Sequence, residues 1–203
     1  MTDLSNPVTS SFQWPSIKRE TDGISIDGSE ITFALRNECK FMRTSQPIPR
    51  SLKSFRWETK VIDGDNNFAF GIGFASELPE LGNGFPQQID SRMIGLNLHE
   101  GSLWRGMDME KILTEKPRNG DVIGCHLQYV EKDGHDYSIV HFYRNGLQVG
   151  IYSNPRTEMY PMIWAYGSKV LKTNLTGESF TYNEGIDIIT YNFQYFYIGI
   201  TFT

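Results

Sequence analysis

The sequence has few cysteines, no dense cluster of basic residues and no catalytic signature, and each absence excludes a class of protein. Cys39 and Cys125 are the two cysteines among 203 residues. Two are too few for a disulfide scaffold or for a zinc site built from thiolates. Lys and Arg are nowhere dense enough to follow a phosphate backbone, and the formal net charge is -5, so we expect no binding to nucleic acid.

Targeting signals are lacking as well. Residues 1–14 are polar, which predicts no signal peptide, and no segment has the length and apolar character of a membrane span. We therefore expect a reducing compartment, the cytoplasm or the nucleus, and no membrane partner. In that compartment both cysteines are expected to be free buried thiols.

Residues that could carry chemistry occur, but not in the arrangements that catalysis or metal binding requires. Phe70-Gly71-Ile72-Gly73 lies inside an expected strand and opens no helix, so it is not a phosphate-binding loop. His126 and His141 are expected to face each other on neighbouring strands. Cys125 points to the opposite face from His126, so the three side chains cannot bind one ion. We expect no enzyme, no metal and no cofactor.

Aromatic residues are abundant, at 13% of the chain, and they favour strands over helices. Short apolar or alternating runs recur about every 8–12 residues between Gly- and Asn-containing turns, which predicts an all-β, two-sheet antiparallel sandwich. A single helical turn fits residues 108–113. The expected strands cover residues 24–26, 30–35, 55–62, 68–75, 93–98, 103–105, 122–130, 137–143, 147–152, 160–164 and 170–175. Hairpin turns are expected at Asp27-Gly28, Asp133-Gly134 and Asn145-Gly146.

Several of these motifs occur together in one order that resembles the SPRY domain family. Gly120-Asp121-Val122-Ile123-Gly124-Cys125 matches the most characteristic motif of the family almost letter for letter. The strand from Phe55 to Val61, the glycine-containing strand from Phe70 to Ala75, and the Asn145-Gly146 hairpin match three further motifs, and Tyr160-Pro161 and Asn174-Leu175 match the last strand pair.

The resemblance implies a non-catalytic module that recognises a peptide or protein partner through loops at one edge of the sandwich. It also implies that the motif residues build the scaffold and do not contact the partner. Recognition surfaces favour Tyr, Trp and Arg, and such residues occur in the segments that correspond to the binding loops of the family. The candidate binding residues are Tyr166, Gly167, Ser168, Trp164, Phe85, Arg36, Asn37, Trp104 and Arg105.

The grounds for assigning these residues to a binding site differ from one residue to the next. Tyr166-Gly167-Ser168 matches the aromatic-Gly loop of the family, with a one-residue gap that leaves open whether Tyr166 or Trp164 holds the contact position. Trp164 is flanked by apolar residues, so it is either a core residue or a contact residue. Aromatic stacking on Tyr166 or Trp104 would also serve a sugar, so a lectin-like carbohydrate-binding sandwich is the alternative function.

Three parts are expected along the chain: a loosely ordered segment over 1–20, the sandwich over 21–183, and an extra C-terminal strand segment over 184–203. Phe12, Trp14 and Ile17 are expected to anchor the first segment to the core. The last segment is almost uncharged and rich in strand-forming residues, so it would aggregate if it were exposed. It is either an extra strand packed on the sandwich or a strand that makes a homodimer.

Overall fold

The computed structural model describes residues 12–16, 23–49, 51–64, 69–113, 115–155 and 157–175. Strands dominate this part of the chain, and its helical content is a single 3-10 turn, Pro86–Gln88. The strands are β1 (Ile24–Asp27), β2 (Glu30–Arg43), β3 (Ser54–Gly64), β4 (Ala69–Ala75), β5 (Leu81–Asn83), β6 (Ile94–Asn97), β7 (Ser102–Arg105), β8 (Asp108–Lys111), β9 (Val122–Lys132), β10 (His135–Arg144), β11 (Leu147–Pro155) and β12 (Tyr160–Asn174). Within the described ranges, no helix is long and apolar enough to cross a membrane.

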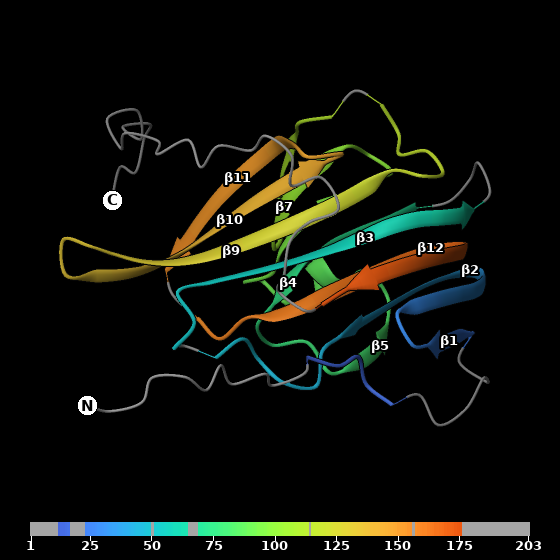
Figure 1. Cartoon of the computed structure of the whole chain (residues 1–203), viewed down its shortest axis with the longest axis horizontal. Helices are drawn as coiled ribbons and strands as arrows, with labels where there is room; N and C mark the ends of the chain where they lie inside the picture. The colour runs from blue at the N-terminus through green and yellow to red at the C-terminus, as the bar shows by residue number, and fades with distance from the viewer. Residues whose placement is uncertain are drawn as a thin grey trace, which may run out of the picture.

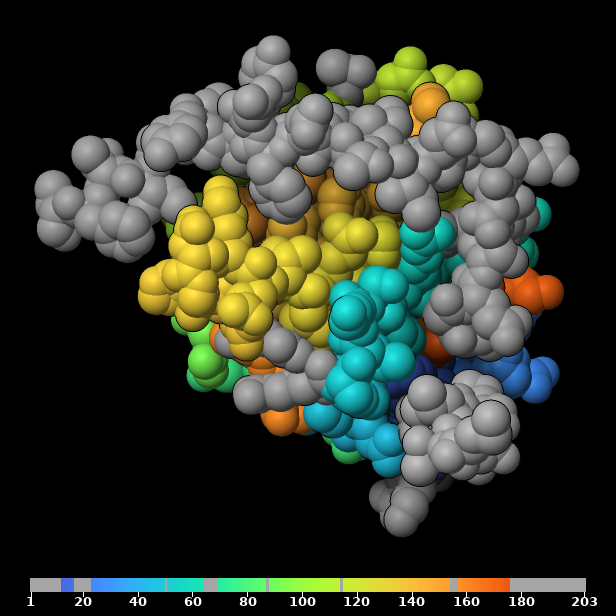
Figure 2. All heavy atoms as spheres, turned by 60° about the vertical axis from the view of Figure 1, so that its left-hand side comes forward, coloured from blue at the N-terminus to red at the C-terminus, as the bar shows by residue number. Residues whose placement is uncertain are grey.

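The strands form a curled antiparallel sheet that folds over itself into two layers. Its main path runs β11-β10-β9-β3-β12-β4-β6-β7-β8, and β2 pairs with β12 as well. Figure 1 shows β9, β3, β12 and β2 side by side in front, with β4 and β7 behind them. From a second direction, Figure 2 shows the β9–β10 hairpin in yellow beside β3 in cyan. The all-β sandwich expected from the sequence is confirmed.

Alternation along the strands explains how the two layers meet. On β3, Phe55, Trp57, Thr59 and Val61 are buried, and they lie on the face that the sequence pattern assigned to the interior. On each strand, alternate side chains point between the two layers, and there they form one large apolar cluster. We call this cluster the main core. The main core includes Ile72, Ile94, Ile123, Val140, Phe142, Ile163 and Leu171.

Two hairpin turns have the backbone that their sequences demand. Asn145 and Gly146 have φ angles of 52° and 80°, and Asp133 and Gly134 have 53° and 76°. Two consecutive positive φ values define the turn type that matches the twist of a hairpin, and Asn-Gly and Asp-Gly adopt it most readily. The hairpins β9–β10 and β10–β11 are therefore confirmed, and so is the hairpin expected at Asp27-Gly28, where β1 pairs with β2.

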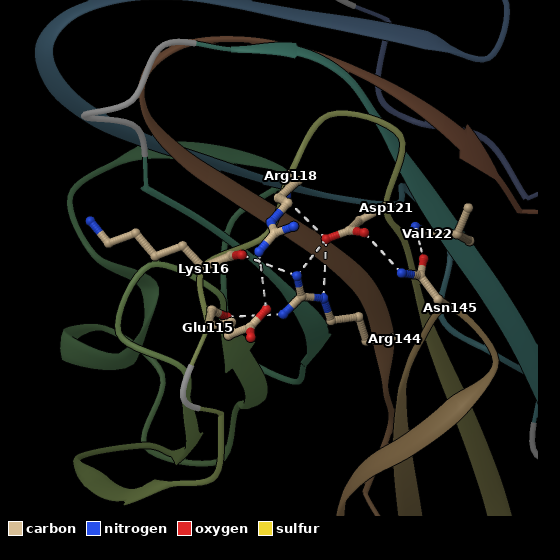
Figure 3. A network of polar contacts seen from close by, with 7 residues as sticks. All are labelled: Glu115, Lys116, Arg118, Asp121, Val122, Arg144 and Asn145. Carbon is tan, nitrogen blue, oxygen red and sulfur yellow. Dashed lines mark hydrogen bonds and ion pairs between the residues drawn. The ribbon is translucent and has the colours of Figure 1, made fainter.

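The Gly120-Asp121-Val122 motif contributes to the scaffold, as Figure 3 shows. The Asp121 carboxylate accepts hydrogen bonds from Arg144 Nη2 at 2.7 Å and from Asn145 Nδ2 at 2.8 Å. Asn145 Oδ1 in turn accepts the backbone N–H of Val122 at 2.9 Å. The motif before β9 is thereby joined to the turn between β10 and β11.

Three sequence expectations need correction. The strands expected over 160–164 and 170–175 form one strand, β12, so Tyr166, Gly167 and Ser168 lie in a strand and not in a loop. The helical turn expected over 108–113 is wrong, because residues 108–111 form β8, which pairs with β7 in the register Trp104↔Met109. The second strand was expected to end at residue 35, but β2 continues to Arg43. The second part of β2 is a strand because it pairs with β12, where Phe41 lies opposite Trp164.

Both ends of the chain were expected to hold special segments. Of the first, residues 12–16 join no strand ladder, yet Trp14 is 9% exposed and belongs to the main core. Ile17 lies outside the described residues, and so do residues 184–203. The two interpretations of that segment, an added strand and a dimer-forming strand, therefore stay predictions.

Candidate functional site

A second apolar cluster lies on the opposite face of the sheet from the main core. On β12, Ile163 and Ala165 belong to the main core, whereas Met162 and Trp164 belong to this second group, as alternation along a strand requires. We call it the outer cluster. Its buried members are Cys39, Phe41, Ala75, Leu78, Met93, Met162 and Trp164, and Ala69, Phe85, Trp104 and Tyr166 pack against them partly buried.

Trp164 is the centre of the outer cluster and is 1% exposed. Phe85 meets its indole edge-on at a centroid distance of 5.9 Å, and Trp104 stacks on it at 6.4 Å. Gly71 lies opposite Trp164 on β4, and a Cβ atom there would lie 2.3 Å from the indole Nε1. Because Gly71 has no side chain, the indole can lie flat on β4. Trp164 therefore forms a buried base on which Phe85 and Trp104 pack.

Three partly exposed aromatic side chains surround this buried indole, and we call them the aromatic surface: Phe85, Trp104 and Tyr166. They come from distant parts of the chain. Phe85 precedes the 3-10 turn, Trp104 is on β7, and Tyr166 is on β12. The fold thus brings together three of the aromatic residues that the sequence proposed for binding.

A bulge next to Tyr166 adds polar groups to this surface. Tyr166 pairs with Cys39, but Ser168 pairs with Ala34, so residues 35–38 of β2 lie opposite Gly167 alone. Gly167 has a φ of 83° and Asn37 a φ of 55°, and Arg36, Asn37 and Ser168 are exposed. The predicted pair Arg36-Asn37 therefore lies across from the predicted Gly167-Ser168.

Trp104 and Arg105 are separated, although they are neighbours in sequence. The Trp104 indole N–H donates to Ser102 Oγ at 2.5 Å on the outer-cluster face. The Arg105 guanidinium instead lies 5.3 Å from the centre of the Tyr152 ring and pairs with Asp108 at 3.0 Å. Arg105 therefore belongs to a different face from the aromatic surface.

Met109 extends the aromatic surface and was missed by the sequence reasoning. It lies opposite Trp104 on β8 and is 61% exposed. Its segment was expected to be a helical turn, so its side chain could not be assigned to this face. Its strand, Asp108–Lys111, has one apolar residue among four exposed ones, so the sequence held no signal for it.

His126, His141 and the two cysteines lie in partly or fully buried environments. His126 and His141 lie opposite each other with stacked rings 5.6 Å apart, as expected, while Cys125 faces the main core. Burial, with the nearby charges of Arg56 and His141, lowers the pKa of His126 to about 3. Burial raises the pKa of Cys39 to about 12, so this residue is a thiol at neutral pH. Among the described residues, no group of three or more His, Cys, Asp or Glu could hold a metal ion.

Comparison with known proteins gives a strong structural likeness. No family model matches the sequence. Over 174 residues, 82% of the chain, it is 23% identical to "Ran-binding proteins 9/10 homolog" of Drosophila melanogaster, and it spans 17% of the length of that protein. The crystal structure of a human SPRY domain superposes with a TM-score of 0.62 at 17% identity, covering 77% of this chain and 98% of the other. The chain has the fold of a SPRY domain.

The family resemblance inferred from the motifs is thus confirmed at the level of the fold. A carbohydrate-binding module from Bacillus subtilis also superposes, with a TM-score of 0.43 at 10% identity over 74% of this chain and 87% of the other. That likeness is too low to support a conclusion about function. In this SPRY-type sandwich, Asp121 and Asn145 hold the scaffold together, while Phe85, Trp104 and Tyr166 remain partly exposed.

Proposed function

We propose that this SPRY-type sandwich is a protein-interaction module, and that it binds a peptide or protein partner through the aromatic surface and the adjoining bulge. It acts by binding alone, without catalysis or a cofactor. The observation that carries this proposal is the grouping of Phe85, Trp104 and Tyr166, partly exposed, around the buried Trp164.

The chemistry of these side chains suits protein recognition. Tyr and Trp bury a large area on binding and lose little conformational freedom, and they are enriched among the residues that contribute most to protein interfaces. Trp164 and Gly71 hold the surface rigid before a partner arrives, which reduces the entropic cost of binding. Arg36 and Asn37 on the bulge offer hydrogen-bond donors at the edge of the aromatic surface.

Affinity purification from cell lysate followed by mass spectrometry tests the proposal. Tyr166→Ala and Phe85→Ala should each weaken the capture of specific partners about tenfold or more, which corresponds to about 1.4 kcal/mol or more. Leu147→Ala is the matched control, because Leu147 is 74% exposed but lies in the β10–β11 hairpin. If both aromatic variants retain all partners that the control retains, the aromatic surface is not the binding site.

A glycan array tests the alternative function on the same surface. Stacking of a sugar on Tyr166 or Trp104 is chemically feasible, since sugar faces pack on aromatic rings. Specific glycan binding that Tyr166→Ala abolishes, together with no captured protein partner, would replace the proposed function by carbohydrate binding.

We also propose that the protein works in the cytoplasm or the nucleus. Cys39 and Cys125 are both free, buried thiols, which is compatible with a reducing compartment. Fluorescence microscopy of the tagged full chain checks this, and accumulation in the secretory pathway would contradict it.

A further inference from the structure

Residues 12–16 contact the sandwich as an extended peptide would. Exposure alternates over the first three residues: Phe12 is half-buried, Gln13 is exposed, and Trp14 is buried. Pro15 is buried as well, and Ser16 is exposed. Alternate anchoring side chains are typical of extended segments that dock on a protein surface.

Side chains provide most of the attachment. The ring centroids of Phe12 and Phe55 are 4.5 Å apart, and Trp14 meets Trp57 edge-on at 5.8 Å. The Trp14 indole N–H donates to Thr173 Oγ1 at 2.9 Å. A backbone bond from the Ser45 N–H to the Gln13 carbonyl is long, at 3.3 Å.

The residues that receive the segment are held by other parts of the sheet. Phe55 and Trp57 of β3 pair with Leu127 and Cys125 of β9. The Thr173 N–H donates to the Ser29 carbonyl at 2.7 Å, and its hydroxyl donates to the same carbonyl at 3.1 Å. The receiving site is therefore built from strand ladders that do not include residues 12–16.

The segment leaves polar groups of the receiving strand unsatisfied. Trp57 is 1% exposed, and its indole N–H has no hydrogen-bond partner among the described residues. The hydroxyl of Thr59, two residues further on the same face of β3, is also buried without a partner in that part of the chain. Unpaired buried polar groups cost free energy, and residues 12–16 supply no acceptor to these two.

We propose that Phe55, Trp57 and Thr173 form a second docking site, separate from the aromatic surface, for an extended peptide of the type Phe-x-Trp-Pro. The chain's own Phe12-Gln13-Trp14-Pro15 occupies this site as an internal ligand. A partner segment that carries the same anchors replaces it. The site uses neither Phe85, Trp104 nor Tyr166, so it does not depend on the function proposed for the aromatic surface.

Cleavage of the full chain next to the segment tests the proposal. A specific protease sequence is inserted directly after Ser16, the folded protein is cut, and native mass spectrometry follows the released fragment. The fragment should stay bound after cutting and exchange with a fluorescent synthetic peptide of residues 8–16. A peptide in which Phe12 and Trp14 are replaced by alanine should bind at least tenfold more weakly. Unfolding of the chain upon cutting, or equal binding of the two peptides, would overturn the proposal.

Variants of the receiving site separate docking from general stability. Thr173→Val keeps the side-chain shape but removes the hydroxyl that accepts from Trp14 and also donates to the Ser29 carbonyl, so it should weaken peptide binding at least fivefold. Thr173→Ser keeps both hydrogen bonds and should bind the peptide as the unchanged chain does. Tyr166→Ala should leave peptide exchange unchanged. Loss of exchange in the Tyr166→Ala variant would show that the peptide binds at the aromatic surface, contrary to this proposal.

Discussion

Trp164 and Tyr166 lie two residues apart on the same face of β12, yet they have different roles. The first is 1% exposed and packs against Phe85, Trp104 and Gly71, whereas the second keeps part of its ring in solvent. Removal of a buried Trp side chain costs about 3–5 kcal/mol. Trp164→Ala should therefore lower the free energy of unfolding by about that amount, and Tyr166→Ala by less than about 1 kcal/mol. Denaturant unfolding measures both, and equal losses would contradict this division of roles.

Gly71 is constrained by the same indole. Its ideal Cβ would lie 2.3 Å from Trp164 Nε1, which is closer than atoms can approach. Gly71→Ala should lower the free energy of unfolding by about 1–3 kcal/mol, the usual cost of overpacking. Trp164→Phe is the matched second change, because a smaller ring makes room for the new methyl group. A double-mutant cycle should show that Gly71→Ala costs less when Trp164→Phe is already present, and strict additivity would argue against this contact.

His126 links protonation to stability. Burial, together with Arg56 and His141, lowers its pKa from 6.5 to about 3, so the unfolded chain binds a proton at pH values where the folded chain does not. Its contribution to stability is complete above about pH 6.5 and is lost as the pH falls toward 3. His126→Gln should make the free energy of unfolding less dependent on pH in this window. Unfolding series at several pH values measure it, with His135→Gln, a change to an exposed histidine at the start of β10, as the control.

Among the elements, the β10–β11 hairpin depends on a polar network that crosses to the segment before β9. Arg144 donates to Asp121 and to the carbonyls of residues 115 and 116 at 2.9 and 3.0 Å (Figure 3). Partial burial alone would raise the pKa of Asp121. Hydrogen bonds from Asn145, the Arg118 backbone N–H and Arg144, with the charge of Arg144, lower it below its ordinary value of 3.8.

The network gives a second prediction about pH. A carboxylate with a lowered folded pKa stabilises the protein fully above its unfolded pKa, near 3.8, and this stability is lost as the pH falls through the folded pKa. Asp121→Asn should therefore make the free energy of unfolding less dependent on pH below about pH 4. At neutral pH, Asp121→Ala should cost about 1.5–3 kcal/mol, because several charge-assisted hydrogen bonds are lost. Asp27→Asn at the end of β1 is the control, and an equal effect in both would contradict the role of the network.

The sequence predicted those elements whose cause is local. Asn145-Gly146 and Asp133-Gly134 adopt positive φ angles more readily than most residue pairs, so their hairpins were recognisable. By contrast, β8 exists because it pairs with β7, and nothing in four mostly charged residues signals that pairing. The bulge opposite Gly167 likewise depends on the register of β2 against β12, so Arg36 and Asn37 could be placed by family resemblance but not by pattern.

At the scale of the whole molecule, β12 joins the two apolar clusters. Its even-numbered residues 162 and 164 lie in the outer cluster, and 163 and 165 lie in the main core. The same strand pairs with β2, β3 and β4. Displacement of β12 would therefore disturb the packing of both clusters. The aromatic surface is accordingly a part of the scaffold and not a detachable loop, and this favours a rigid binding surface.

This coupling predicts a single unfolding transition for the described sandwich. Ile163→Ala creates a cavity in the main core, where Ile163 is fully buried, and should cost about 2–5 kcal/mol. Far-UV circular dichroism follows the sheet, and tryptophan fluorescence in a Trp14→Phe and Trp57→Phe background follows Trp104 and Trp164 of the outer cluster. Both signals should shift to lower denaturant together and by the same amount, as two-state behaviour requires. If the fluorescence transition kept its midpoint while circular dichroism shifted, the outer cluster would be an independently stable unit, and the rigid support proposed for the aromatic surface would not come from β12.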